Sequence, residues 1–94
     1  MYEATIFEMS TERMYTVSAR TAKEAITLAW RAAMQDQVGE DEDVSTWQPD
    51  GLRVTSPSDE QFKNLMPLPD ATDLAVIVDR GRMTTACGFV REMW

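Results

Sequence analysis

The sequence predicts an α+β fold in which an antiparallel-leaning sheet is covered on one face by one long, alanine-rich helix. Two observations lead to this prediction. Residues 21–39 carry apolar side chains at helical spacing between two capping signals. On both sides of them, short segments with apolar and polar residues in alternation occur in pairs, joined by polar turns. The expected order is β-β-α-β-β-α-β-β, in a single domain that covers residues 1–94.

The chain opens with a strand pair. Residues 2–9 alternate as a strand does, and residues 14–19 repeat the pattern after the polar turn Ser-Thr-Glu-Arg. A turn of this length predicts an antiparallel hairpin. Both faces carry apolar residues, so the first strand either is central or meets a partner. One face is expected to present Tyr2, Ala4 and Ile6, and the other Glu3, Thr5, Phe7 and Met9.

The helix has a start signal and a stop signal. Thr21 followed by Glu24 is a capping box, in which the threonine hydroxyl accepts a backbone N–H of the first turn. Gly39 supplies a left-handed stop. A stripe of small residues allows close packing on a sheet, so this helix is expected to cover the sheet. The stripe consists of Ala22, Ala25, Ile26, Ala29 and Ala33, with Leu28 and Ala32 on one flank and Trp30 on the other.

Four consecutive acids, Glu40, Asp41, Glu42 and Asp43, follow the helix. Repulsion between like charges predicts that they form an exposed loop. Between residues 36 and 50 there are six acids and no basic residue. Residues 44–48 are expected to form a short strand, and residues 52–55 its return strand after the turn Pro-Asp-Gly.

The second half predicts a short helix and a closing strand pair. Ser56 can cap a helix that has Pro57 at its first position and ends before Pro67. Residues 74–78 are continuously apolar and predict a central strand, with residues 83–90 as its partner. Gly88 marks a bulge or a close approach in that partner strand.

Composition excludes several classes of function. The chain has no histidine and a single cysteine, Cys87, which removes histidine-dependent nucleophile activation, histidine metal sites and an intrachain disulfide. The acidic run lacks the glycine and the distal glutamate of a calcium loop. We therefore expect a non-enzyme without metal or cofactor. No apolar run approaches the about 20 residues that span a bilayer, and the N-terminus does not resemble a signal peptide, so a cytoplasmic location is expected.

The net charge is −7, from 16 acidic and 9 basic side chains. Nucleic acids and anionic membranes are therefore not expected to be direct partners, since binding phosphate needs a basic surface. A protein with a basic surface is compatible with this charge, and so is the simpler role of solubility.

Three tryptophans and seven methionines are a high number for 94 residues. Trp30 and Met34, at the edge of the helix stripe, have two interpretations: they complete a small core, or they form an interface, where tryptophan and methionine are enriched. An interface would favour a homodimer, either along an exposed strand edge or over the second face of the sheet.

Residues 12–25 read E-R-x-Y-T-V-x-A-x-T-A-K-E-A. Together with the acidic charge and the order of the elements, this pattern resembles small accessory proteins of phages and mobile genetic elements, among them some anti-CRISPR proteins and products of integron cassettes. The resemblance extends over the first forty residues and identifies no functional residue. It implies an inhibitor that occupies the nucleic-acid groove of a host complex with its acidic surface.

The leading hypothesis is a non-enzymatic protein-interaction module that mimics the charge of a nucleic acid. Its candidate partner-binding residues are Glu40, Asp41, Glu42, Asp43, Trp30 and Met34. The alternative is a small ligand-binding protein whose sheet and helix enclose an apolar pocket lined by methionine, tryptophan and phenylalanine.

Overall fold

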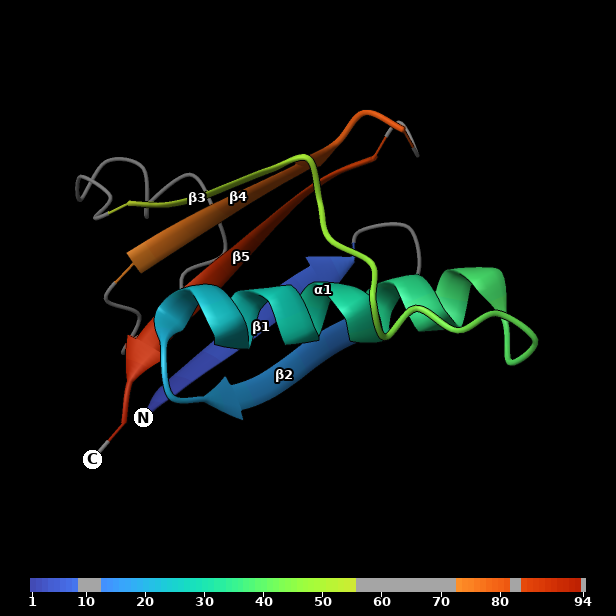
Figure 1. Ribbon diagram of the computed structural model, residues 1–94. Coiled ribbons are helices and arrows are strands. Elements are labelled where there is room, and N and C mark those ends of the chain that lie inside the picture. The colour runs from blue at the N-terminus through green and yellow to red at the C-terminus, as the bar shows by residue number, and fades with distance from the viewer. Residues whose placement is uncertain (9–12, 56–72, 82–83, 94) are drawn as a thin grey trace.

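The computed structural model describes residues 1–8, 13–55, 73–81 and 84–93. Over these residues one helix packs on a five-stranded antiparallel sheet, so the α+β class is confirmed (Figure 1). In chain order the elements are β1 (Tyr2–Glu8), β2 (Arg13–Ala19), α1 (Ala22–Val38), β3 (Gly51–Thr55), β4 (Asp73–Asp79) and β5 (Thr84–Glu92).

The strands lie in the order β2-β1-β5-β4-β3, so the last strand of the chain is the middle strand of the sheet. The two predicted pairs, β1 with β2 and β4 with β5, are both present and antiparallel. The two pairs join where β1 lies against β5, with Thr5 opposite Phe89. Local turns therefore form each pair, and contacts between the two ends of the chain complete the sheet.

The predicted strand at residues 44–48 is wrong. Residues 45–46 form a turn, in which the Trp47 N–H donates to the Val44 carbonyl oxygen at 3.0 Å. The Asp43 side chain accepts the Ser45 N–H at 2.9 Å. Such local side-chain bonds compete with strand pairing, and here they bend the backbone.

The order of the elements also differs from the predicted order. β3 pairs with β4, in the register Leu52 opposite Ile77, and not with the segment before it. The described order is β-β-α-β-β-β in place of the predicted one. Met9 and the helix predicted from Ser56 onward lie outside the described residues.

Both ends of α1 agree with the capping signals. The Thr21 hydroxyl oxygen accepts the Glu24 N–H at 3.1 Å, and Gly39 follows the helix with φ of +87°. The helix is too short and too polar to cross a membrane, and no other helix is present in the described ranges. Its buried residues are Ala25, Ile26, Ala29, Trp30, Ala33 and Met34.

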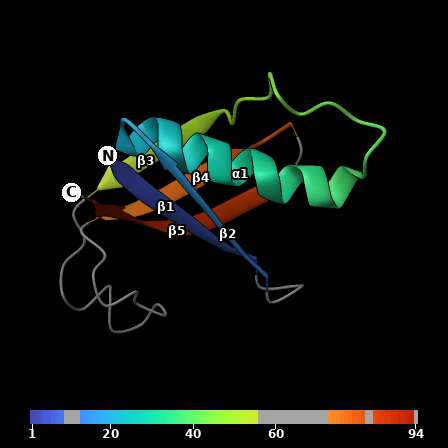
Figure 2. The ribbon, with the colours of Figure 1, turned by 90° about the horizontal axis from the view of Figure 1, so that it is seen from below.

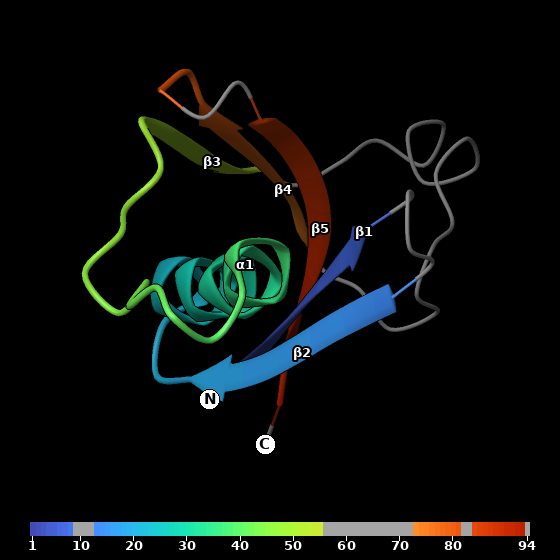
Figure 3. The same ribbon diagram turned by 90° about the vertical axis from the view of Figure 1, so that its right-hand side faces the viewer.

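The sheet curves around α1, which lies mainly over β1 and β2 (Figure 3). Gly88 of β5 lies at this contact between helix and sheet. A Cβ atom at this position would lie 2.7 Å from the Thr5 carbonyl oxygen and 2.8 Å from Cδ1 of Ile26. The close approach predicted for Gly88 is therefore confirmed, and the absence of a side chain there allows both contacts.

Candidate protein-interaction surface

The acidic loop, residues 39–50, connects α1 to β3. It lies at the end of the molecule away from the two termini (Figures 1 and 2). Glu40, Asp41, Glu42 and Asp43 are all exposed, as the repulsion between their charges predicts. The loop therefore presents four consecutive carboxylates to solvent.

Helix side chains hold the backbone of the acidic loop. Nε2 of Gln35 donates to the carbonyl oxygens of Gly39, at 2.6 Å, and of Glu42, at 2.7 Å. Nε of Arg31 donates to the Trp47 carbonyl oxygen at 2.7 Å. The sequence pattern did not single out either residue. The spacing of four between Gln35 and Gly39, one helical turn, is the signal that could have identified the first contact.

A buried side chain anchors the same loop. Val44, directly after the four acids, is only 5% exposed and belongs to the hydrophobic core, against which Trp47 packs. The loop runs from the end of α1 to β3 on the helix side of the sheet (Figure 3). Core packing and hydrogen bonds thus position the backbone, while the carboxylates remain in water.

Two acids of the region, Asp43 and Asp50, accept hydrogen bonds from backbone N–H groups. The Ser45 backbone N–H, followed by its side chain, lowers the pKa of Asp43 from its ordinary value. Oδ2 of Asp50 accepts the Arg80 N–H at 2.8 Å. Asp43 is therefore negatively charged well below neutral pH.

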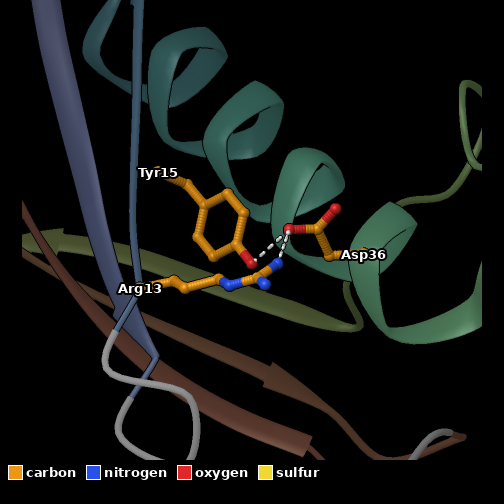
Figure 4. A network of polar contacts seen from close by, with 3 residues as sticks. All are labelled: Arg13, Tyr15 and Asp36. Atoms are coloured by element: carbon orange, nitrogen blue, oxygen red, sulfur yellow. Dashed lines mark hydrogen bonds and ion pairs between the residues drawn. The ribbon is translucent and has the colours of Figure 1, made fainter.

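Asp36, in the last turn of α1, is bound to the edge strand β2 (Figure 4). Its Oδ2 accepts a hydrogen bond from the Tyr15 hydroxyl at 2.7 Å and from Nη1 of Arg13 at 3.2 Å. The tyrosine bond, then the arginine bond and charge, lower the pKa of Asp36. The same contacts raise the pKa of Arg13. This acid thus fastens α1 to β2, in contrast to the four acids of the loop.

A dependence on pH follows for Asp36. A carboxylate whose pKa is lower in the folded than in the unfolded state stabilises the fold above its unfolded pKa, about 3.9. This stabilisation disappears as the pH falls through the folded-state pKa. We expect Asp36→Asn to lower the thermal midpoint slightly at pH 7, since the network is solvent-exposed. The difference from wild type should vanish in acid, where both side chains are neutral.

The measurement is the thermal midpoint by circular dichroism between pH 7 and pH 2.5. Asp41→Asn removes the same charge from the acidic loop without changing the contacts of Asp36, and serves as the control. If the thermal midpoints of Asp36→Asn and wild type differ as much in acid as at pH 7, the stabilisation does not come from the charge of Asp36.

The two remaining candidate residues lie in the core. Trp30 is 0% exposed and Met34 is 4% exposed, and both belong to the hydrophobic cluster between α1 and the sheet. Of the two interpretations, the structure agrees with the core role, because the cluster encloses both side chains. The ligand pocket lined by such residues stays a prediction.

Within the described ranges, no group of three or more histidine, cysteine, aspartate or glutamate side chains is arranged to hold a metal ion. Comparisons with protein-family models, with curated proteins and with solved structures gave no match for this chain. The resemblance to accessory proteins of phages and mobile elements therefore stays a prediction. The exposed carboxylates of the acidic loop and the contacts that position them are the features of the described residues that bear on function.

Proposed function

We propose that this chain is a non-enzymatic interaction module whose acidic loop binds a basic surface on a partner protein. The observation that supports this proposal is the combination of four adjacent, exposed carboxylates with a loop backbone held by Gln35, Arg31 and Val44. Like charges repel in the free protein, and a cationic partner would relieve this repulsion. A positioned loop also loses less conformational entropy on binding than an unstructured one.

The charge of the loop agrees with mimicry of a nucleic acid. Glu40 and Asp41 lie in a turn and Glu42 in a bend, so the four carboxylates are gathered in a short stretch of the surface. Their charge has the same sign as that of the phosphates along a DNA strand. A protein groove lined with lysine and arginine would accept either the loop or a nucleic acid. The partner class that we propose is a nucleic-acid-binding protein or complex, with the loop in its groove.

The acids should act mainly on the rate of association. Because steering is long-range, we expect Glu40→Gln/Asp41→Asn/Glu42→Gln/Asp43→Asn to slow binding about tenfold or more at low salt. The effect should shrink at high salt, since screening acts over about 8 Å at physiological ionic strength and over shorter distances above it. The measurement is stopped-flow association at low and high salt, with a partner obtained by affinity capture from the native host.

A matched pair of double variants separates the loop from total charge. Glu40→Gln/Glu42→Gln and Glu24→Gln/Glu92→Gln each remove two exposed acids and change the net charge from −7 to −5. Only Glu40→Gln/Glu42→Gln should slow the association of this chain with the partner. Only this variant should also compete less well with the nucleic acid that the partner binds. Equal effects of the two pairs would show that the loop acts only through the overall charge. Equal wild-type rates at both salt concentrations would overturn the proposal.

A further inference from the structure

β2 forms one edge of the sheet, and within the described part of the chain it pairs with β1 alone. In Figure 2, which views the molecule from below, β2 is the strand nearest the viewer. An edge strand presents a row of backbone N–H and C=O groups to which a further strand can bind. β2 has few of the features that block such binding. Its seven residues pair with β1 without a bulge, contain no proline and include a single charged residue, Arg13.

A hydrogen bond between the two ends of the chain shows which backbone groups of β2 point outward. The Met93 N–H donates to the Met1 carbonyl oxygen at 2.7 Å, so the odd-numbered residues of β1 turn their backbone groups toward β5. Because these directions alternate along a strand, the even-numbered residues of β1 turn theirs toward β2, where they lie opposite odd-numbered residues. The residues of β2 that point their N–H and C=O groups away from the sheet are therefore Met14, Thr16 and Ser18.

The side chains of β2 alternate in the same way. Tyr15 and Val17 are half-buried and pack against the hydrophobic core on the α1 side. Met14, Thr16 and Ser18 have exposed side chains. The core of the chain therefore extends to this edge and ends there in two apolar side chains that are partly open to solvent.

We propose that a second copy of this chain binds this edge, with the two β2 strands antiparallel about a two-fold axis at Thr16. The outward groups then form about six hydrogen bonds, through the pair Thr16–Thr16 and the two pairs Met14–Ser18. Between these pairs, Tyr15 of each copy lies opposite Val17 of the other. Pairs of an aromatic and a β-branched residue stabilise antiparallel strands. The half-buried side chains of the two edges thus complete one continuous sheet and core.

The charge at this edge favours a second copy. β2 contains no acidic residue, and Nη1 of Arg13 lies 3.2 Å from Oδ2 of Asp36, so the charge of its basic residue is compensated within the chain. Two copies with a net charge of −7 each repel one another, and this repulsion is small where both edges are locally neutral. A different protein would have to supply an extended strand with a matching order of residues, whereas a second copy carries one by symmetry.

The opposite edge of the sheet is less suited to such pairing. β3 has five residues, and Arg53 at its centre is exposed. Antiparallel pairing of two β3 strands about this residue would place two positive charges side by side, which is unfavourable. β2 is therefore the edge that we assign to the second copy.

The helices leave room for this arrangement. α1 packs over both β1 and β2 (Figure 3), and a two-fold axis perpendicular to the sheet places both helices on the same face. Because strands lie about 4.8 Å apart, two helices centred over their own β1 and β2 are separated by three strand spacings, about 14 Å. Helices in contact need only about 8–10 Å, so the two copies do not collide.

The number of residues involved sets the strength of the dimer. Seven residues of β2 in each copy fall short of the about 20–30 residues a side of a standard interface. The dimer is therefore weak, with a dissociation constant in the micromolar range. It does not depend on the function proposed for the acidic loop, whose four carboxylates lie outside β2 and keep their exposure.

Sedimentation equilibrium between 5 and 500 μM tests the proposal. Thr16→Pro removes the N–H at the axis but none of the hydrogen bonds to β1, a position in which an edge strand tolerates proline, and should raise the dissociation constant at least tenfold. Thr16→Ala loses the same hydroxyl, which lies 3.0 Å from that of Thr5, but keeps the N–H, and should change the constant less than threefold. A monomeric wild type at 500 μM, or equal constants for the two variants, would overturn the proposal.

A second pair of variants applies if Thr16→Pro does not fold. Thr16→Lys places two like charges together at the axis and should also raise the dissociation constant at least tenfold. Gln48→Lys makes the same charge change at an exposed residue of the acidic loop and should leave the constant within threefold of wild type. Equal effects of the two lysine variants would contradict pairing through β2.

Amide hydrogen exchange, followed by NMR at 20 and 500 μM, identifies the edge that pairs. The outward N–H groups of Met14, Thr16 and Ser18 should exchange about threefold or more slowly at the higher concentration, since only the dimer gives them hydrogen-bond partners. The controls are Leu52 and Val54, whose N–H groups point outward at the β3 edge by the same alternation. Their exchange should not depend on concentration. Slower exchange at the β3 edge, or none at Thr16, would overturn the proposal.

Discussion

Replacing Gly88 with alanine is expected to lower the free energy of unfolding by about 2–3 kcal/mol, the upper part of the range for overpacked cores. The new Cβ atom would lie 2.7 Å from the Thr5 carbonyl oxygen, which belongs to the backbone of β1 and is held in the sheet. Cδ1 of Ile26, at 2.8 Å, could turn away, but the carbonyl group could not. Relief of the clash therefore requires β1 and β5 to separate where they join the two strand pairs.

The measurement is urea unfolding, with Gly51→Ala as the matched control. At Gly51, also a strand residue, an added Cβ atom would lie 3.9 Å from Cβ of Val78, an ordinary contact. This variant should keep or slightly raise the stability, because alanine has less backbone freedom than glycine in the unfolded chain. Similar losses for both variants would show that any alanine in a strand is harmful here, and that the close approach at Gly88 is not the cause.

A second large effect is expected for Ala29→Leu. Ala29 is fully buried in the middle of α1, where the small residues set the distance between helix and sheet. Leucine adds three carbon atoms to a closed contact. The helix must then move away from β1 and β2, at a cost of about 1–3 kcal/mol. Chemical denaturation gives the free energy, and the loss should appear as a lower midpoint with an unchanged slope.

Ala32→Leu is the control for this substitution. Ala32 lies three residues, about one turn, after Ala29 in the same helix but is only half-buried, so the longer side chain has solvent on one side. Helix propensity hardly changes between alanine and leucine. We expect a loss below about 0.5 kcal/mol, as for an ordinary surface substitution. If Ala32→Leu were the more harmful of the two, the assignment of the buried face would be wrong.

Signals in the sequence that act over a few residues predicted the structure best. The Thr21 cap lies three residues from the N–H that it accepts, and Gly39 stops the helix by its own φ angle. The first hairpin follows from alternation around a short turn, and the second from a continuously apolar strand with its partner directly after it. The exposure of Glu40–Asp43 likewise follows from repulsion between neighbours. The part of the candidate surface that the sequence could predict is therefore its acidic character and its contact with solvent.

Failures occurred where local patterns competed with distant partners. Residues 44–48 were expected to form a short strand, but the bond from the Ser45 N–H to Asp43 and the burial of Val44 accompany a turn instead. β3 then pairs with β4, across a connection that the local pattern does not specify. Trp30 could have been core or interface by periodicity alone. Trp30 belongs to the core, because α1 packs both its alanine stripe and the flank that carries Trp30 against the strands.

The sequence by itself thus determined the type of most elements, the ends of α1, the small residues at the helix–sheet contact and the exposure of the acids. Only the tertiary structure decided the strand order β2-β1-β5-β4-β3. Through that order it decided that β2 lies at an edge of the sheet, and that Asp36 meets Tyr15. The physical reason is the range of the interactions. Capping, turn formation and charge repulsion act between residues a few positions apart, whereas pairing and burial depend on which distant segments reach one another first and fit best.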